Sequence, residues 1–139
     1  MKADEETKAS VLARLETLNR AFISQDGEQV LKLFATDPDV TFLASEAGET
    51  AVGQNELKLL LNGLFSRPEA YSWKWLEVSV SASGTVAWVS ADTVIQVHKG
   101  TDMKEYPYRL TTVFEKRGTE WLLMHFHGSE PVNQEDDND

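Results

Sequence analysis

The chain has 139 residues, 41% of them hydrophobic, and a formal net charge of -10; this length allows one domain with a substantial core but not two. The absence of cysteine excludes disulfides, thiolate metal ligands and a cysteine nucleophile. Because no basic stripe is available to neutralise phosphates, nucleic acid is not an expected partner.

Both ends of the chain are polar and acidic. Residues 1–8 (MKADEETK) do not resemble a signal peptide, and no segment has the apolar length of a membrane helix. We therefore expect a cytoplasmic protein with no membrane partner. Residues 132–139 (VNQEDDND) hold too little apolar surface to fold alone and are expected to form a disordered acidic tail. A single domain is then expected over residues 9–131.

The first half of the chain shows helical periodicity, with apolar residues three and four positions apart. Gly27 is placed to end the first helix, and TDPD at 36–39 ends the second. A short strand is expected at 40–44 and a loop at 46–53. The three expected helices cover residues 11–23, 30–34 and 54–65.

From Tyr71 onward the apolar period becomes two, which is typical of strands. Short spacers rich in glycine separate the apolar runs and predict hairpins in an antiparallel meander. Helices followed by a sheet predict an α+β domain with the helices on one side of a curved sheet. The four expected strands cover residues 71–81, 85–97, 106–116 and 121–129.

Alternation along each strand predicts which side chains face the helices. In the last strand the apolar row is Leu122, Met124 and Phe126, so His125 and His127 are expected on the opposite face. The strand at 85–97 is apolar in both rows, which indicates that one face covers the helices and the other meets a partner. This pattern predicts a homodimer through the outer face of the sheet.

The order of these segments resembles the SnoaL-like branch of the NTF2-like superfamily, over residues 9–131. The closing pattern is the most specific part, and it also resembles the association domain of calcium/calmodulin-dependent kinase II. The residues of that pattern are Arg109, Thr111, Trp121, His125, His127, Ser129 and Pro131. The resemblance implies a cone of three helices packed on a strongly curved antiparallel sheet, with a pocket between them and dimerisation through the outer sheet face.

The resemblance to the kinase association domain implies that Ser90, Thr112 and Gly128 face the pocket. That domain has arginines at these positions for a small anion, and this chain has none, so the resemblance does not imply carboxylate binding by that route. With the apolar rows, the resemblance gives a set of expected ligand-binding residues. They are Trp88, Ser90, Asp92, Tyr108, Leu110, Thr112, Phe114, Met124 and Phe126.

The pair His125–x–His127 raises the question of a metal site, since both rings lie on one face of a strand. Such a site needs a third and a fourth ligand, and His98 is the only other histidine in the chain. We therefore expect no metal, and expect the two histidines to make hydrogen bonds at the sheet edge and dimer interface.

Asp92 is the best candidate for proton transfer, because a partly desolvated carboxylate has a raised pKa. Ketosteroid isomerase, in the same superfamily, pairs an aspartate base with a tyrosine and a protonated aspartate. Those partners are missing: the first helix has Phe22 and no tyrosine, and VTFLAS at 40–45 has no acid. A structural Asp92, bonded to Tyr108, Thr112 or backbone, is the favoured interpretation.

Other candidate residues receive structural interpretations. The aromatic row Tyr71, Trp73 and Trp75 is interpreted as packing or interface, on the face opposite Leu76, Val78 and Val80. Glu46 and Glu49 are interpreted as solvated side chains of a loop near the pocket mouth.

Three functions remain open from the sequence. We favour a module that binds a small, mainly apolar molecule, since the expected pocket is aromatic and aliphatic. The alternatives are an isomerase or dehydratase that uses Asp92, and a structural dimerisation domain without a ligand. No cofactor is expected, since the sequence has no nucleotide-binding loop, catalytic serine elbow or zinc signature.

Overall fold

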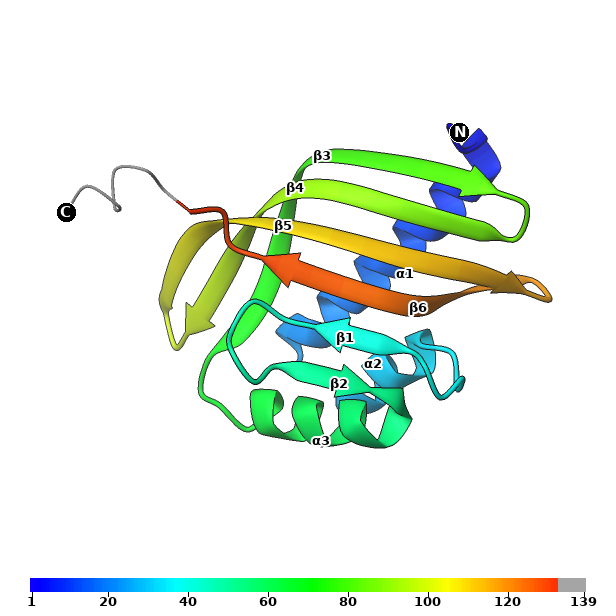
Figure 1. The fold of residues 1–139 in the computed structure, drawn as a ribbon. Helices are drawn as coiled ribbons and strands as arrows, with labels where there is room; N and C mark the ends of the chain where they lie inside the picture. Colours follow the sequence, from blue (N-terminus) through cyan, green and yellow to red (C-terminus); the bar gives the residue numbers. More distant parts are fainter. Residues whose placement is uncertain (133–139) are drawn as a thin grey trace.

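The computed structural model describes residues 1–132. It is an α+β domain in which three helices pack on one curved, six-stranded sheet, as predicted (Figure 1). The expected acidic tail lies outside the described residues, except for Val132. The elements are α1 (Glu5–Ile23), α2 (Gly27–Leu33), β1 (Thr41–Leu43), β2 (Thr50–Val52), α3 (Gly53–Phe65), β3 (Ala70–Ser83), β4 (Val86–Lys99), β5 (Asp102–Arg117) and β6 (Glu120–Ser129).

The N-terminal residues belong to the fold, which corrects the expected boundary at residue 9. Asp4 caps α1 by accepting a hydrogen bond from the Thr7 amide at 2.7 Å. Ala3 is buried, and its amide donates to the Val80 carbonyl at 3.1 Å. The prediction that Gly27 ends α1 was wrong, since Asp26 caps α2 and Gly27 is the first residue of that helix. Among the helices of residues 1–132, none combines the length and apolarity needed to cross a membrane.

The strands are ordered β2-β1-β6-β5-β4-β3. The four long strands form the predicted antiparallel meander, but β1 joins its edge by pairing in parallel with β6. Part of the expected loop at 46–53 is strand β2, which pairs antiparallel with β1. These two short strands bring the loop between them, residues 44–49, to the end of β6.

Two irregularities reverse the alternation of side chains along their strands. In β6 the pairing with β5 shifts at Met124, so Leu123 and Phe126 are both buried on the face toward the helices. Leu122 and Met124 do not share that face, which corrects the expected apolar row. In β3 the shift falls at Leu76, so Trp73 and Val80 share the inner face instead of lying on opposite faces.

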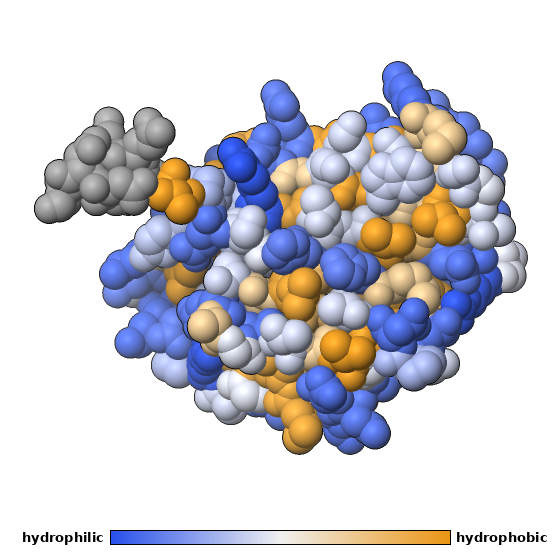
Figure 2. All heavy atoms as spheres, in the orientation of Figure 1, coloured by the Kyte–Doolittle hydropathy of each residue, from blue (hydrophilic) through white to orange (hydrophobic). Residues whose placement is uncertain are grey.

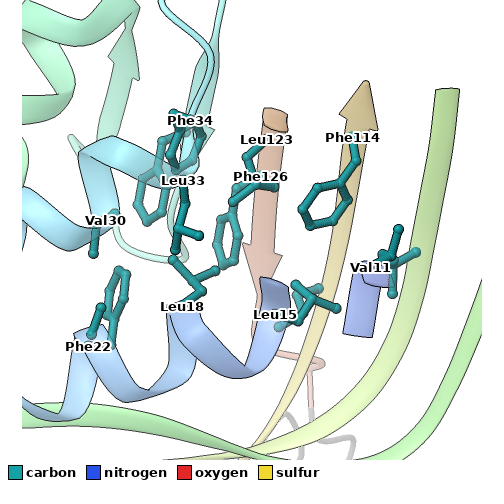
Figure 3. Packing of buried hydrophobic residues seen from close by; sticks show 14 of the residues in the cluster. Val11, Leu15, Leu18, Phe22, Val30, Leu33, Phe34, Phe114, Leu123 and Phe126 are labelled. Carbon is teal, nitrogen blue, oxygen red and sulfur yellow. The ribbon is translucent and has the colours of Figure 1, made fainter. Parts of the chain in front are cut away.

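The core lies between α1 and the inner face of the sheet (Figure 3). Leu15, Leu18 and Phe22 project from one face of α1 toward Phe126 and its neighbours, and each is at most 3% exposed. Burying a side chain of this size contributes about 1.5–3 kcal/mol. This packing closes one end of the space between helix and sheet and leaves the other end open.

Candidate functional site

A cavity of about 470 Å³ opens at the end of the domain where β3 and β5 begin and β6 ends. Its inner wall is made of buried aromatic and aliphatic side chains, and its rim includes the loop at 44–49 and the turn that follows α3. The lining residues are Phe22, Phe42, Ala44, Ser45, Glu46, Glu49, Leu64, Arg67, Glu69, Tyr71, Trp73, Ile95, Val97, Tyr106, Tyr108, Phe126 and Glu130.

The floor of the cavity is a cluster of aromatic rings. Phe126 stacks on Phe42 with ring centroids 4.6 Å apart. The ring centroid of Trp73 lies 4.9 Å from that of Phe22 and 5.8 Å from that of Phe126. The Trp73 indole Nε1 is buried without a hydrogen-bond partner within residues 1–132. Trp73 was interpreted from the sequence as packing or interface, and it both packs in the core and lines the cavity.

Tyr108 supplies the buried hydroxyl of the site. Its side chain enters from β5, and burial raises the pKa of the phenol to about 12, against the opposing effect of a hydrogen bond with Ser45. The phenol therefore stays protonated at neutral pH and can donate a hydrogen bond. Gly128 on β6 makes this position available, because a Cβ at residue 128 would lie only 2.0 Å from the Tyr108 hydroxyl oxygen.

Glu49 is the buried carboxylate of the site, which corrects its interpretation as a solvated loop residue. It is 8% exposed and accepts a hydrogen bond from the Glu46 amide at 3.1 Å. Burial raises the pKa of Glu49, and the nearby Glu46 charge acts in the same direction, whereas the Glu46 amide and Arg67 oppose the shift. A carboxyl whose pKa is raised by burial, at a cavity wall, is a candidate for proton transfer.

The raised pKa predicts how Glu49→Gln changes stability with pH. Because the pKa of Glu49 in the folded state lies above its ordinary value of 4.5, the wild type loses stability as pH rises through the folded pKa. Glutamine does not titrate, so the stability of the variant relative to the wild type should increase between pH 4.5 and pH 7. Urea unfolding at both values measures this difference.

The exposed Glu77 on the outer face provides a control, since Glu77→Gln removes the same charge without touching the cavity. If Glu49→Gln instead becomes less stable relative to the wild type as pH rises, then ionisation of Glu49 does not destabilise the folded protein.

The prediction that Asp92 lies in the pocket was wrong. Asp92 is on the outer face of β4, where its Oδ1 lies 3.5 Å from Arg109 Nε and its side chain is 61% exposed. Trp88 and Ser90 share this outer row. The sheet buries the other apolar row because that row has no charged member, and its residues are Ala87, Val89, Ala91, Thr93 and Ile95.

Asp92→Asn should therefore change the free energy of unfolding by less than about 0.5 kcal/mol, since exposed ion pairs contribute little. Thermal or urea unfolding at neutral pH measures this. A loss above about 1 kcal/mol, typical of a disturbed buried hydrogen bond, would contradict the exposed position.

The remaining predicted ligand-binding residues divide into three groups. Tyr108 and Phe126 line the cavity. Leu110, Thr112 and Phe114 face inward on β5 but are at most 1% exposed and lie in the filled core rather than at the cavity wall. Met124, displaced by the irregularity of β6, has its sulfur 4.0 Å from the Arg117 guanidinium and is absent from the wall.

His125 and His127 lie outside the cavity, as expected. They pair with Val113 and Thr111 of β5, and His125 is half-buried. Burial and the neighbouring His127 charge lower the pKa of His125, so its ring favours the neutral form at physiological pH. The two rings cannot serve the cavity from this face.

Sequence reasoning missed Glu49, Arg67 and Glu130 as cavity residues. One signal was present for Glu49: it precedes the buried Ala51 by two positions, and residues at this spacing share a face of a strand. Arg67 and Glu130 follow the ends of α3 and β6, where periodicity gives no direction for a side chain.

Comparison with known proteins gives a family match over most of the chain. The sequence model of the SnoaL-like domain family matches residues 11–133. No curated protein matches the chain.

Solved structures share the fold at low sequence identity. A candidate dehydratase of the NTF2-like family from Streptomyces avermitilis is 19% identical, with a TM-score of 0.81 over 94% of this chain and 100% of that one. A candidate calcium/calmodulin-dependent kinase II association domain from Xanthomonas campestris is 17% identical, with a TM-score of 0.72 over 95% and 91% of the two chains. An NTF2-like superfamily protein from Salmonella enterica is 15% identical, with a TM-score of 0.79 over 94% and 95%. These similarities show that the fold of this chain is the NTF2-like α+β cone.

Proposed function

Since the chain belongs to the SnoaL-like domain family, we propose that its cavity binds a small, mainly apolar molecule. The observation that carries this proposal is a cavity of about 470 Å³ with an aromatic floor and a few convergent polar groups. A ligand body would rest on Phe22 and Trp73, above the fully buried ring of Phe126, where its apolar surface leaves water. The Tyr108 hydroxyl would donate a hydrogen bond to an oxygen of the ligand.

The proposal is tested by titration calorimetry with 2-phenylethanol, an aromatic alcohol that fits this description. Ala44 lines the cavity, so Ala44→Leu should fill its entrance and weaken binding. Ala47 is exposed in the same loop, and Ala47→Leu provides a matched control that should bind as the wild type does. Equal binding by both variants would place the ligand elsewhere and overturn the proposal.

A second candidate function is proton transfer, as in an isomerase or dehydratase, with Glu49 in the role first considered for Asp92. The observation that favours it is the buried Glu49 carboxyl, whose pKa is raised by burial, on the same cavity wall as the protonated Tyr108. In such a reaction Glu49 would remove a proton next to a carbonyl, and Tyr108 would donate a hydrogen bond to the oxygen that gains charge. The name of the Streptomyces avermitilis protein is consistent with this class.

Deuterium exchange tests the catalytic candidate without knowledge of the natural substrate. Phenylacetone in D₂O should exchange its α-protons faster when the wild-type protein is present than in buffer alone. Glu49→Gln should lower the rate of this protein-dependent exchange by roughly 10²–10⁴-fold. Exchange that is unaffected by Glu49→Gln would remove this candidate and leave binding alone.

We also propose a homodimer through the outer face of the sheet. Three half-buried apolar side chains, Trp88, Val94 and Val113, lie on that face. Figure 2 shows hydrophobic patches among polar side chains on this side of the molecule. Sedimentation velocity at micromolar concentration should give a dimer, and Val113→Arg should convert it to a monomer. A wild-type monomer would contradict the dimer, whereas a dimer that binds no small molecule would favour a purely structural domain.

A further inference from the structure

The cavity wall carries an excess of negative charge. Four carboxylates line it against one guanidinium, Arg67, which leaves three negative charges in excess when all are ionised. The excess remains if Glu49, whose pKa is raised by burial, holds a proton. The carboxylates belong to Glu46, Glu49, Glu69 and Glu130.

Arg67 lies within ion-pair distance of two of these carboxylates. Its Nη1 lies 3.8 Å from Glu46 Oε2 and 3.8 Å from Glu49 Oε2. Within residues 1–132, neither Glu69 nor Glu130 forms an ion pair with a basic side chain. A positively charged group at the cavity mouth would therefore meet carboxylates that the protein itself leaves without a counter-ion.

Aromatic rings surround the same space. Tyr71 and Tyr106 lie toward the exposed end, and Trp73 and Tyr108 lie deeper. The face of an aromatic ring attracts a cation, and the attraction grows where the cation is desolvated. The Tyr108 phenol stays protonated because burial raises its pKa to about 12, so this ring enters the site uncharged.

We propose that the cavity selects organic cations: an ammonium group at the mouth, near Glu69 and Glu130, joined to an apolar body that rests on the aromatic floor. The inference rests on the proposed function, because it specifies the charge of the molecule that the cavity binds. The aromatic cavity, open at its mouth, gives the cation a place, and the unpartnered indole N–H of the buried Trp73 leaves a donor for a polar atom of the same ligand.

Three probes with the same phenylethyl body test the selection. They are (2-phenylethyl)trimethylammonium, the neutral 2-phenylethanol and the anion 3-phenylpropanoate. Titration calorimetry at low salt should rank them cation, neutral, anion, with the cation bound about tenfold more tightly than the alcohol. The preference should narrow as salt is added, because exposed carboxylates are screened.

A matched pair of variants separates the cavity mouth from the overall charge of -10. Glu69→Gln with Glu130→Gln removes two charges at the mouth and should reduce the ratio of cation to alcohol affinity to near one. Glu77→Gln with Asp92→Asn removes two charges on the outer face, where both side chains are exposed, and should leave the ratio at its wild-type value.

The outcomes distinguish this inference from the proposed function. If the alcohol or the anion binds at least as tightly as the ammonium probe, the cation preference is overturned and binding itself stands. If the outer-face variant reduces the ratio as much as the mouth variant does, the preference comes from bulk charge and not from the cavity. If no probe binds, both proposals fail.

Discussion

Gly128→Ala should destabilise the domain by about 1–3 kcal/mol, the usual cost of overpacking a core. The new Cβ would lie 2.0 Å from the Tyr108 hydroxyl oxygen and 2.5 Å from Cζ of the same ring, so the ring must leave its position. Tyr108 is 3% exposed and faces the cavity, so its displacement should also weaken the binding of 2-phenylethanol. Urea unfolding and titration calorimetry measure the two effects.

Gly63→Ala is the matched control, since Gly63 lies in α3 and a Cβ there meets nothing within 4 Å. This control should gain about 0.4–1 kcal/mol, because alanine loses less backbone entropy on folding. Adding Tyr108→Leu to Gly128→Ala removes the clashing ring atoms, so the double variant should lose less than the sum of the two single losses. Additive losses would show that Tyr108 and Gly128 do not interact.

Phe126→Ala should cost about 3–5 kcal/mol, the largest loss expected for a substitution in the cavity. Phe126 is fully buried and stacks on Phe42 at 4.6 Å, with the two rings inclined by 11°. Truncation removes the ring that joins the core to the cavity floor and leaves a cavity among its neighbours. Urea unfolding of the purified protein measures the loss.

Phe126→Leu keeps most of the volume and should lose less than Phe126→Ala. Leu59→Ala provides the surface control, because Leu59 is 72% exposed on α3 and should change stability by less than about 0.5 kcal/mol. A Phe126→Ala variant as stable as this control would contradict the packing of the cavity floor.

Much of the fold follows from periodicity in the sequence. The helical face of α1 and the alternation in the four long strands predicted an α+β domain with helices on one side of an antiparallel sheet. The parallel pairing of β1 with β6 was not predictable, because Thr41–Leu43 is too short to carry information about its partner. β2 was missed for the same reason.

The candidate site was harder to predict, for two physical reasons. Both rows of β4 contain apolar residues, so alternation alone could not decide whether Ala91 or Asp92 faced inward. The resemblance to the kinase association domain pointed to Ser90, and this choice moved the strand by one residue, which exchanges its two faces. In β6 the irregularity at Met124 has no signature in a run of hydrophobic residues, so Met124 was placed on the wrong face.

The polar residues of the cavity come from segments that have no period. Glu49 was taken for a solvated residue because it stands in a glycine-containing loop, and only the pairing of β1 with β6 brings that loop over Tyr108. In contrast, Tyr108 and Phe126 were correctly placed on the inner side of the sheet, at the cavity wall. Tyr108 lies on the more apolar row of β5, and Phe126 lies beyond the irregularity of β6, where the alternation holds.

Small molecules that bind in the aromatic cavity, and not at the outer face of β4, should change the indole signal of one tryptophan and leave that of another unchanged. Trp73 lines the cavity, whereas Trp88 lies on the outer face beside Ser90. In ¹H–¹⁵N NMR spectra recorded during titration with 2-phenylethanol, we expect the Trp73 indole peak to move and saturate while the Trp88 peak stays in place. Movement of the Trp88 peak with a stationary Trp73 peak would contradict binding in the cavity.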